Sequence, residues 1–179
     1  NFHFVIYPLN QNKEFNFISV IRKKLSKDQI LNENLFKSSE FLKSLTNEIN
    51  QKTSLNLNGK LKNIKSFPIY VSDKIETYRK KNIYFVGDAL FAFPPSFAQG
   101  ASQSIESSKE LYDEIINKTN NYYKKRSEKL KKVNWRSKLN YFAFHLSNPL
   151  TVLIRNIFLK YLTKNDKFLE IYLGKIYRN

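Results

Sequence analysis

The sequence predicts a mixed α/β fold, and three of its features carry that prediction. Apolar and polar residues alternate over residues 2–7 and 15–21, and the polar stretch PLNQNKE separates them, which is typical of two strands joined by a turn. The apolar run IYFV at residues 83–86 leads straight into a Gly-Asp pair, as expected of a strand buried in a sheet that is covered on both faces. From residue 101 onward, apolar residues recur at helical spacing.

The composition is that of a globular protein. Of the 179 residues, 41% are hydrophobic and 15% aromatic, which is ample material for a core. Cysteine is absent, so disulfides and thiolate metal sites are excluded, and a reducing compartment fits. Methionine is also absent and the chain opens at Asn1, from which we expect a piece of a longer or processed protein. No signal segment is recognisable.

The formal net charge of +16 raises the question of a nucleic-acid or anionic-membrane partner. The basic residues are mostly lysine, whereas arginine, the better phosphate ligand, is scarce. We therefore interpret most of the charge as solvated surface and expect no nucleic-acid binding. The stretch from Lys118 to Lys138 is the exception that keeps a basic binding helix open, with nine basic residues and one acidic residue.

Two further elements are predicted before residue 83. Ser38 or Ser39 is a candidate N-cap for a helix whose apolar residues fall on one face: Phe41, Leu42, Leu45 and Ile49. The stretch LNLNGKLKN is expected to be a loop, and SFPIYVS at residues 66–72 a strand near a sheet edge because of its early proline.

The C-terminal third is predicted to be helical. A helix from Ala101 to Ile115 is expected to run on toward residues 122–145. Another follows Asn148-Pro149, with an apolar stripe at helical spacing: Leu150, Leu153, Ile154, Ile157, Phe158 and Tyr161. His145, Asn148, Arg155 and Lys160 interrupt the apolar residues of 139–162, so no membrane-spanning segment is predicted.

The stretch GDALFAFPPSFAQGAS, residues 87–102, has the chemistry of a ligand site. A carboxylate at the end of a buried strand lies at the edge where open α/β sheets bind ligands, and it accepts hydrogen bonds from sugar-like hydroxyls. The proline pair makes a stiff wall. The amides that open the next helix lack intrahelical partners and carry partial positive charge. Together they favour a ligand with a hydroxylated portion and an electron-rich planar portion.

At these residues the chain resembles the flavin-dependent aromatic hydroxylases, the single-component FAD monooxygenases related to p-hydroxybenzoate and salicylate hydroxylase. Their second flavin motif, approximately GDAAHxxPPxxGQGxN, lies over residues 87–102 without a gap. Residues 3–23 resemble the family's substrate-domain hairpin, and residues 122–156 its C-terminal helices.

The resemblance implies a fold, a cofactor and a reaction. It implies part of an FAD/NAD(P)-binding Rossmann-like domain, part of an antiparallel-sheet substrate domain, and C-terminal helices. The segments would be 1–80 (substrate domain), 81–118 (flavin motif) and 119–179 (basic helical region). The activity would be hydroxylation of an aromatic or quinone-precursor substrate with FAD, NAD(P)H and oxygen. Apart from the resemblance, we expect a cytoplasmic location, and the basic helix with the amphipathic segment Leu150 to Tyr161 leaves peripheral contact with the inner membrane open.

The resemblance also assigns residues to the cofactor. Asp88 would bind the ribityl or ribose hydroxyls of FAD, Gly87 would allow close approach, and Pro95 would wall the space between flavin and substrate. The helix opening at Gln99 would present its amides to the pyrimidine edge of the flavin: Gly100, Ala101 and Ser102. No catalytic residue is predicted, and no metal site, since His3 and His145 lack suitably spaced partners.

The chain departs from the family pattern in three places. Leu90-Phe91 replace the usual Ala-His, Ala98 stands for the first glycine of GQG, and Ser102 for the final Asn. No GxGxxG turn occurs among the four glycines, so we expect the pyrophosphate-binding half to lie N-terminal to this sequence. Two alternatives stay open: another flavoprotein of the same fold, such as a halogenase or reductase, and a basic module that binds nucleic acid or anionic lipid.

Overall fold

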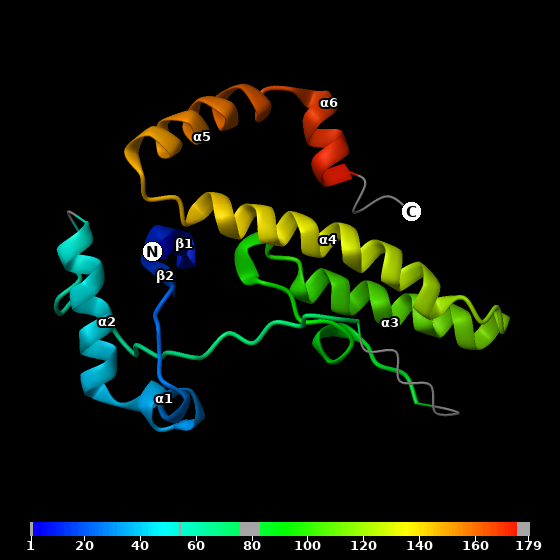
Figure 1. Ribbon diagram of the computed structural model, residues 1–179, viewed down its shortest axis with the longest axis horizontal. Coiled ribbons are helices and arrows are strands. Elements are labelled where there is room, and N and C mark those ends of the chain that lie inside the picture. Colours follow the sequence, from blue (N-terminus) through cyan, green and yellow to red (C-terminus); the bar gives the residue numbers. More distant parts are fainter. Residues whose placement is uncertain (1, 54, 76–82, 175–179) are drawn as a thin grey trace. The chain divides into compact units, whose positions relative to one another are not determined.

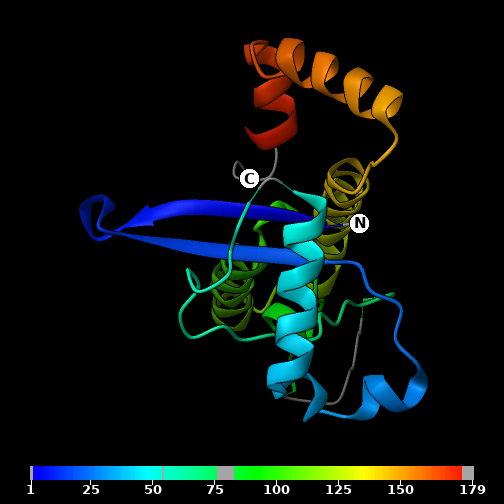
Figure 2. The ribbon, with the colours of Figure 1, turned by 90° about the vertical axis from the view of Figure 1, so that its left-hand side faces the viewer.

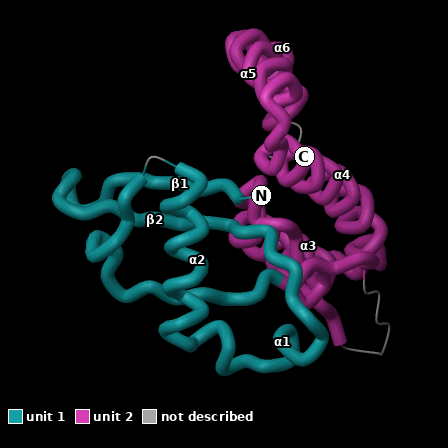
Figure 3. The backbone as a smooth tube through the Cα atoms, turned by 60° about the vertical axis from the view of Figure 1, so that its left-hand side comes forward, with its two compact units in different colours: residues 1–69 teal, residues 70–179 magenta. Residues whose placement is uncertain are grey.

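The computed structural model describes residues 2–53, 55–75 and 83–174, and the chain forms two compact units, residues 1–69 and 70–179 (Figure 3). The described residues contain six α-helices and one two-stranded antiparallel sheet, so the protein is mixed α/β and mostly helical. This confirms the predicted class at the level of mixed α/β structure. Each unit is described by itself below.

The first unit begins with the predicted hairpin, a long two-stranded ribbon in Figure 2. Strand β1 (Phe2–Leu9) pairs antiparallel with β2 (Glu14–Ile21), from Phe2 opposite Ile21 to Leu9 opposite Glu14. The turn between them holds Asn10, Gln11 and Asn12 at positive φ, a region that asparagine tolerates better than most residues. The alternating pattern and the polar turn were therefore sufficient to predict this element.

Two helices follow in the same unit. The short α1 (Lys27–Leu31) starts at a capping box formed by Ser26 and Gln29. Helix α2 (Ser39–Lys52) starts where predicted, because the Ser38 side chain accepts a hydrogen bond from the Phe41 amide at 3.1 Å. Its Ile49 is buried. The prediction of a capped helix over these residues is confirmed.

The strand predicted at residues 66–72 is absent from the structure. These residues have no ladder partner among the described residues, and Phe67, Ile69, Tyr70 and Val71 are exposed. Isolated hydrogen bonds remain: the Ser72 amide donates to the Ala92 carbonyl at 2.9 Å, the Ala92 amide donates to the Ser72 hydroxyl at 3.0 Å, and the Ser66 hydroxyl donates to the Phe36 carbonyl at 2.6 Å. Strand formation needs a paired neighbour as well as β-forming residues, and the apolar run alone did not supply one.

The second unit is built on two long antiparallel helices, α3 (Gly100–Asn117) and α4 (Tyr122–Phe144), which lie side by side in Figure 1. The prediction that one helix runs on through this region is wrong. Lys118 ends α3 in the left-handed conformation at φ 51°, and Asn120 also has a positive φ of 57°. The chain reverses there, and α4 packs back along α3.

A buried arginine joins these two helices. Arg126 of α4 is 1% exposed, and its Nη1 lies 3.3 Å from Glu110 and 3.5 Å from Glu106 of α3. Its Nη2 donates to the Gln103 side-chain oxygen at 2.9 Å. Lys129 pairs with Glu106 as well. Since a buried charge must be paired, these contacts fix the register between α3 and α4.

The chain ends in smaller helices. Helix α5 (Pro149–Leu162) follows Asn148 as predicted, and the Asn148 side chain caps it by accepting from the Leu150 and Thr151 amides. Helix α6 (Asp166–Leu169) continues into a π-helical turn, Glu170–Gly174. Within the described part of the chain, none of the helices combines the length and the apolar character needed to cross a bilayer.

Candidate functional site

Residues 83–86, predicted to be a buried strand, lead into the site as extended chain without a strand partner among the described residues. Ile83 and Tyr84 are exposed. The backbone of Phe85 bonds instead to two side chains of α4: the Tyr122 hydroxyl donates to its carbonyl at 2.9 Å, and its amide donates to the Tyr123 hydroxyl at 3.4 Å. The strand prediction is therefore wrong for this structure, because tyrosines take the place of a neighbouring strand.

Tyr122 holds residues 83–86, called here the entry segment, through its hydrogen bond to Phe85. Its side chain is buried, and burial raises its pKa to about 12. The hydroxyl therefore stays protonated at neutral pH and remains a donor to Phe85. Rings of Tyr84, Tyr122 and Tyr123 pack against one another beside it.

Gly87 makes a turn that requires glycine. Its φ is +57°, and a Cβ atom there would lie 2.6 Å from the Ser104 Oγ of α3. Its amide donates to the Ser107 hydroxyl at 3.1 Å, while its carbonyl accepts from the Leu90 and Phe91 amides, both at 3.0 Å. The turn is thus pressed against the first two turns of α3.

This turn brings Asp88 to the start of α3. The carboxylate is exposed, and its Oδ1 lies 3.9 Å from the position that a Cβ atom on Gly100 would occupy. The acidic side chain and the helix opening, separated by a dozen residues of sequence, are therefore adjacent. In the described part of the chain, no hydrogen bond or ion pair occupies this carboxylate.

The opening turn of α3 leaves its amides uncapped by a side chain. Gln99 is the N-cap residue and makes no capping hydrogen bond to the helix amides. Its side-chain oxygen accepts instead from the Ser102 hydroxyl at 3.2 Å and from the Gln103 amide group at 3.3 Å, which holds it beside the helix. Gly100 is half-buried and Ala101 exposed. Donors with partial positive charge therefore lie next to the Asp88 acceptor.

The proline loop before α3 is fastened to α4. Ser96 is buried and its hydroxyl donates to the Ser137 carbonyl at 2.6 Å, while the Asn140 side chain donates to the Ser96 carbonyl at 3.3 Å. Pro95 is exposed at the start of a 3₁₀ turn. Ala98 then takes a left-handed φ of 50°, which redirects the chain into α3. The two hydrogen bonds of Ser96 thus fasten the loop to α4.

Leu90 and Phe91, where the family pattern has Ala-His, form the core beneath this site. Leu90 is 1% and Phe91 3% exposed, and both cluster with Tyr122 and Leu130 of α4. The two side chains point away from solvent. These apolar residues therefore serve to pack the segment against α4.

Several supporting residues were not identified from the sequence. Ser104, Ser107 and Ser96 bond or abut the motif, and Tyr122 and Tyr123 hold the segment that leads into it. The spacing of Ser104 and Ser107 could have indicated a shared polar face of α3, because residues three or four apart lie on the same side of a helix. Among the described residues, no group of three or more His, Cys, Asp or Glu side chains is arranged to hold a metal ion.

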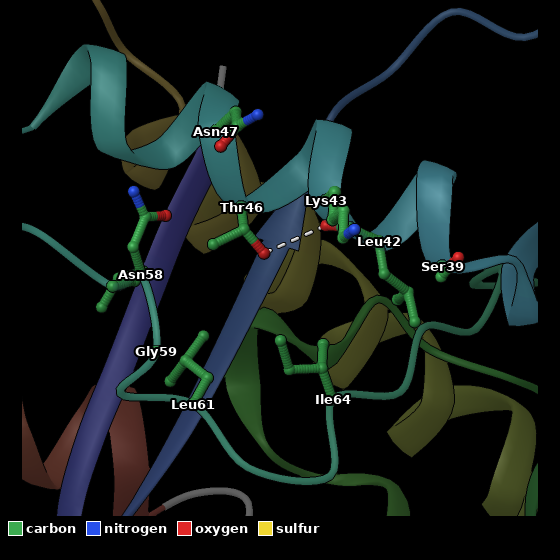
Figure 4. Close-up of a pocket in the computed structure, with 10 residues that line it drawn as sticks. Ser39, Leu42, Lys43, Thr46, Asn47, Asn58, Gly59, Leu61 and Ile64 are labelled. Atoms are coloured by element: carbon green, nitrogen blue, oxygen red, sulfur yellow. Dashed lines mark hydrogen bonds between the residues drawn. The ribbon is translucent and has the colours of Figure 1, made fainter.

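Two pockets are lined by residues other than Asp88 and Gly100. One, of about 460 Å³ in the first unit, lies between α2 and the loop after it, where Leu42, Leu61 and Ile64 line it (Figure 4). The other, of about 380 Å³ in the second unit, is lined by Ile75, Phe91, Leu130 and Asn134 among others. Asp88 and Gly100 line neither of them. The Asp88 side chain itself is exposed to solvent.

Comparison with protein-family profiles, with curated proteins and with solved structures gives no match to this chain.

Proposed function

We propose that this chain belongs to an FAD-dependent monooxygenase that uses NAD(P)H and oxygen to hydroxylate an aromatic or quinone-precursor substrate. The observation that supports it is the position of the Asp88 carboxylate, whose Oδ1 lies 3.9 Å from where a Cβ atom on Gly100 would be, at the uncapped opening of α3. A sugar-like chain needs an acceptor and an electron-rich ring edge needs donors, and the two kinds of group stand next to each other here.

Each residue has a defined part in this proposal. Asp88 accepts hydrogen bonds from ribityl or ribose hydroxyls, and Gly87 makes the turn that brings the acid there. The amides of Gly100, Ala101 and Ser102 face the pyrimidine edge of the flavin, and Pro95 walls its substrate side. Gln99 is kept by its bonds to Ser102 and Gln103 from capping the amides itself.

When bound, the flavin would take electrons from NAD(P)H and activate oxygen, which is chemistry that the protein side chains do not supply. The chain's own contribution is to hold and orient the cofactor and to stabilise negative charge at the helix opening. The proposal includes a Rossmann-like domain, although residues 83–86 have no strand partner among the described residues. It also includes a GxGxxG segment, which the printed sequence does not contain.

The test is FAD binding by Asp88→Asn in the full-length protein, measured by flavin absorbance after gel filtration and by titration. Removing a charged acceptor of hydroxyl hydrogen bonds should weaken FAD binding by about tenfold or more. Asp113→Asn, an exposed acid farther along α3, is the matched control and should bind normally. Equal FAD retention by the Asp88 variant, or a wild-type protein without flavin, would refute the proposed role.

The reaction class is tested separately. A halogenase or a flavin reductase would use the same cofactor contacts, so cofactor binding does not distinguish them. Oxygen consumption coupled to NAD(P)H oxidation, with incorporation of labelled oxygen into an aromatic product, is the result expected of a hydroxylase.

A further inference from the structure

Helix α5 exposes a continuous apolar face. Six apolar side chains at helical spacing are between 46% and 69% exposed: Leu150, Leu153, Ile154, Ile157, Phe158 and Tyr161. A monomeric soluble protein rarely leaves such a row uncovered. The face is therefore expected to have a partner.

The opposite side of α5 determines where that face points. Val152, Arg155 and Leu162 are the half-buried residues of the helix and recur on one side of it. Arg155 donates to the carbonyl of Ala143, near the end of α4, at 2.9 Å. Arg155 thus ties α5 to the end of α4, and the apolar row lies on the opposite side of the helix, although Leu159 on the Arg155 side is also 43% exposed.

Helix α4 carries a second exposed surface of mixed character. Lys124, Lys131 and Lys138 follow one another at intervals of two helical turns, and all three are exposed. Trp135 and Phe142 lie four residues after two of these lysines, on the same face, and are 62% and 65% exposed. Lysines thus alternate with large aromatic side chains along this face.

The charge around both surfaces is strongly one-sided. Residues 122–164 contain eleven basic residues and one acidic residue, Glu128. Lys160 and Lys164 lie beside the apolar row of α5 and are exposed. An apolar row flanked by lysines and by amphipathic Trp and Tyr side chains is typical of helices that lie in a membrane interface.

We propose that the exposed faces of α4 and α5, called here the α4–α5 surface, dock this protein on an anionic lipid bilayer. The α5 row enters the boundary between headgroups and acyl chains, while the α4 lysines contact acidic headgroups. Helix α5 has 14 residues, or about 21 Å, shorter than a hydrocarbon core of about 30 Å, so it lies in the interface. The inference does not depend on flavin binding.

Other partners fit these residues less well. A nucleic acid would neutralise the lysines but leave the apolar row of α5 in water. A second copy packed on the same surface would bring two sets of lysines together, which costs free energy. A lipid bilayer with acidic headgroups matches both the charge and the apolar side chains.

The test is binding of the full-length protein to vesicles, once with phosphatidylcholine alone and once with an equimolar mixture that includes phosphatidylglycerol. Binding is measured by co-sedimentation and by fluorescence of Trp135, the single tryptophan of the chain. We expect binding to the mixed vesicles with a blue shift of that fluorescence, and binding about tenfold or more weaker to phosphatidylcholine. Raised salt should weaken binding to the mixed vesicles.

Two variants separate the apolar and the charged contributions. Ile157→Glu with Phe158→Glu should reduce binding to mixed vesicles by about tenfold or more. Lys124→Gln, Lys131→Gln and Lys138→Gln together should remove the preference for anionic lipid. The matched control is Ile115→Glu with Ile116→Glu, which changes two exposed apolar residues of α3 and should bind like wild type.

The proposal is overturned by any of three results: no binding to mixed vesicles, equal binding to both vesicle types, or unimpaired binding by the α5 variant. A fourth result would identify a second copy of the chain as the partner instead. In that case the wild-type protein would be a dimer in solution and would bind no vesicles, and the α5 variant would be a monomer. Circular dichroism of each variant checks that it is folded. We expect the variants to fold because the substituted residues are exposed.

Discussion

Gly87 and Ser104 approach so closely that a Cβ atom on Gly87 would lie 2.6 Å from the Ser104 Oγ. Gly87 follows residues 83–86 at the candidate site, and Ser104 lies one turn after the start of α3. The Ser104 hydroxyl also donates to the Gly100 carbonyl at 2.9 Å, so it is not free to move aside without losing a bond. This contact couples the Asp88 turn to the helix opening beside it.

Gly87→Ala should therefore destabilise the protein by about 2–4 kcal/mol, from left-handed strain of roughly 1–2 kcal/mol and from overpacking of similar size. The measurement is urea unfolding followed by circular dichroism. Gly59 also has a positive φ, of 69°, but nothing lies within 4 Å of its Cβ position. Gly59→Ala should thus show the strain alone.

A double variant isolates the clash. Ser104→Ala removes the nearest atom, so Gly87→Ala should cost about 1 kcal/mol less in that background than in wild type. An unchanged cost would mean that the two side chains do not interfere and that the geometry at this turn is wrong.

Tyr122→Phe should cost about 1–2 kcal/mol of unfolding free energy, because it removes the buried hydroxyl that donates to the Phe85 carbonyl. Tyr161→Phe is the control, since Tyr161 is 69% exposed, and it should stay within about 0.5 kcal/mol of wild type. Equal effects from both variants would show that the hydroxyl of Tyr122 does not hold the entry segment.

The same tyrosine predicts a pH effect. Its pKa is raised from 10.0 to about 12 by burial, so ionisation favours the unfolded state. The stability that the neutral hydroxyl supplies is complete below pH 10 and is lost as the pH rises through about 12. The difference in unfolding midpoint between wild type and Tyr122→Phe should shrink across this interval. A constant difference would contradict the assigned environment.

Local signals in the sequence predicted the elements that local contacts stabilise. The hairpin follows from alternation on both sides of a polar turn, and α2 and α5 begin at the caps that Ser38 and Asn148 provide. In each case, residues near in sequence make the decisive hydrogen bonds.

Elements that depend on distant partners were predicted poorly. The run at residues 83–86 has the composition of a buried strand, but its backbone partners are tyrosines of α4, almost forty residues away. The reversal at Lys118 was missed because no glycine or proline marks it. Arg126 lies in the basic stretch that was left open as a binding helix, although its side chain is buried against α3. Composition does not reveal which basic residue a neighbouring helix covers.

Arg126 leads to the strongest stability prediction. Arg126→Met should destabilise the second unit by about 3–5 kcal/mol, because it leaves Glu106, Glu110 and the Gln103 side chain without the guanidinium that joins them. Trp135 lies in α4, so its fluorescence during urea unfolding reports on this unit directly. Lys109→Met breaks an exposed pair with Asp113 within α3 and should cost no more than about 0.5 kcal/mol. If both variants unfolded at the same urea concentration, the register of α3 against α4 would have to be different, and the position of Asp88 beside Gly100 would lose its structural support.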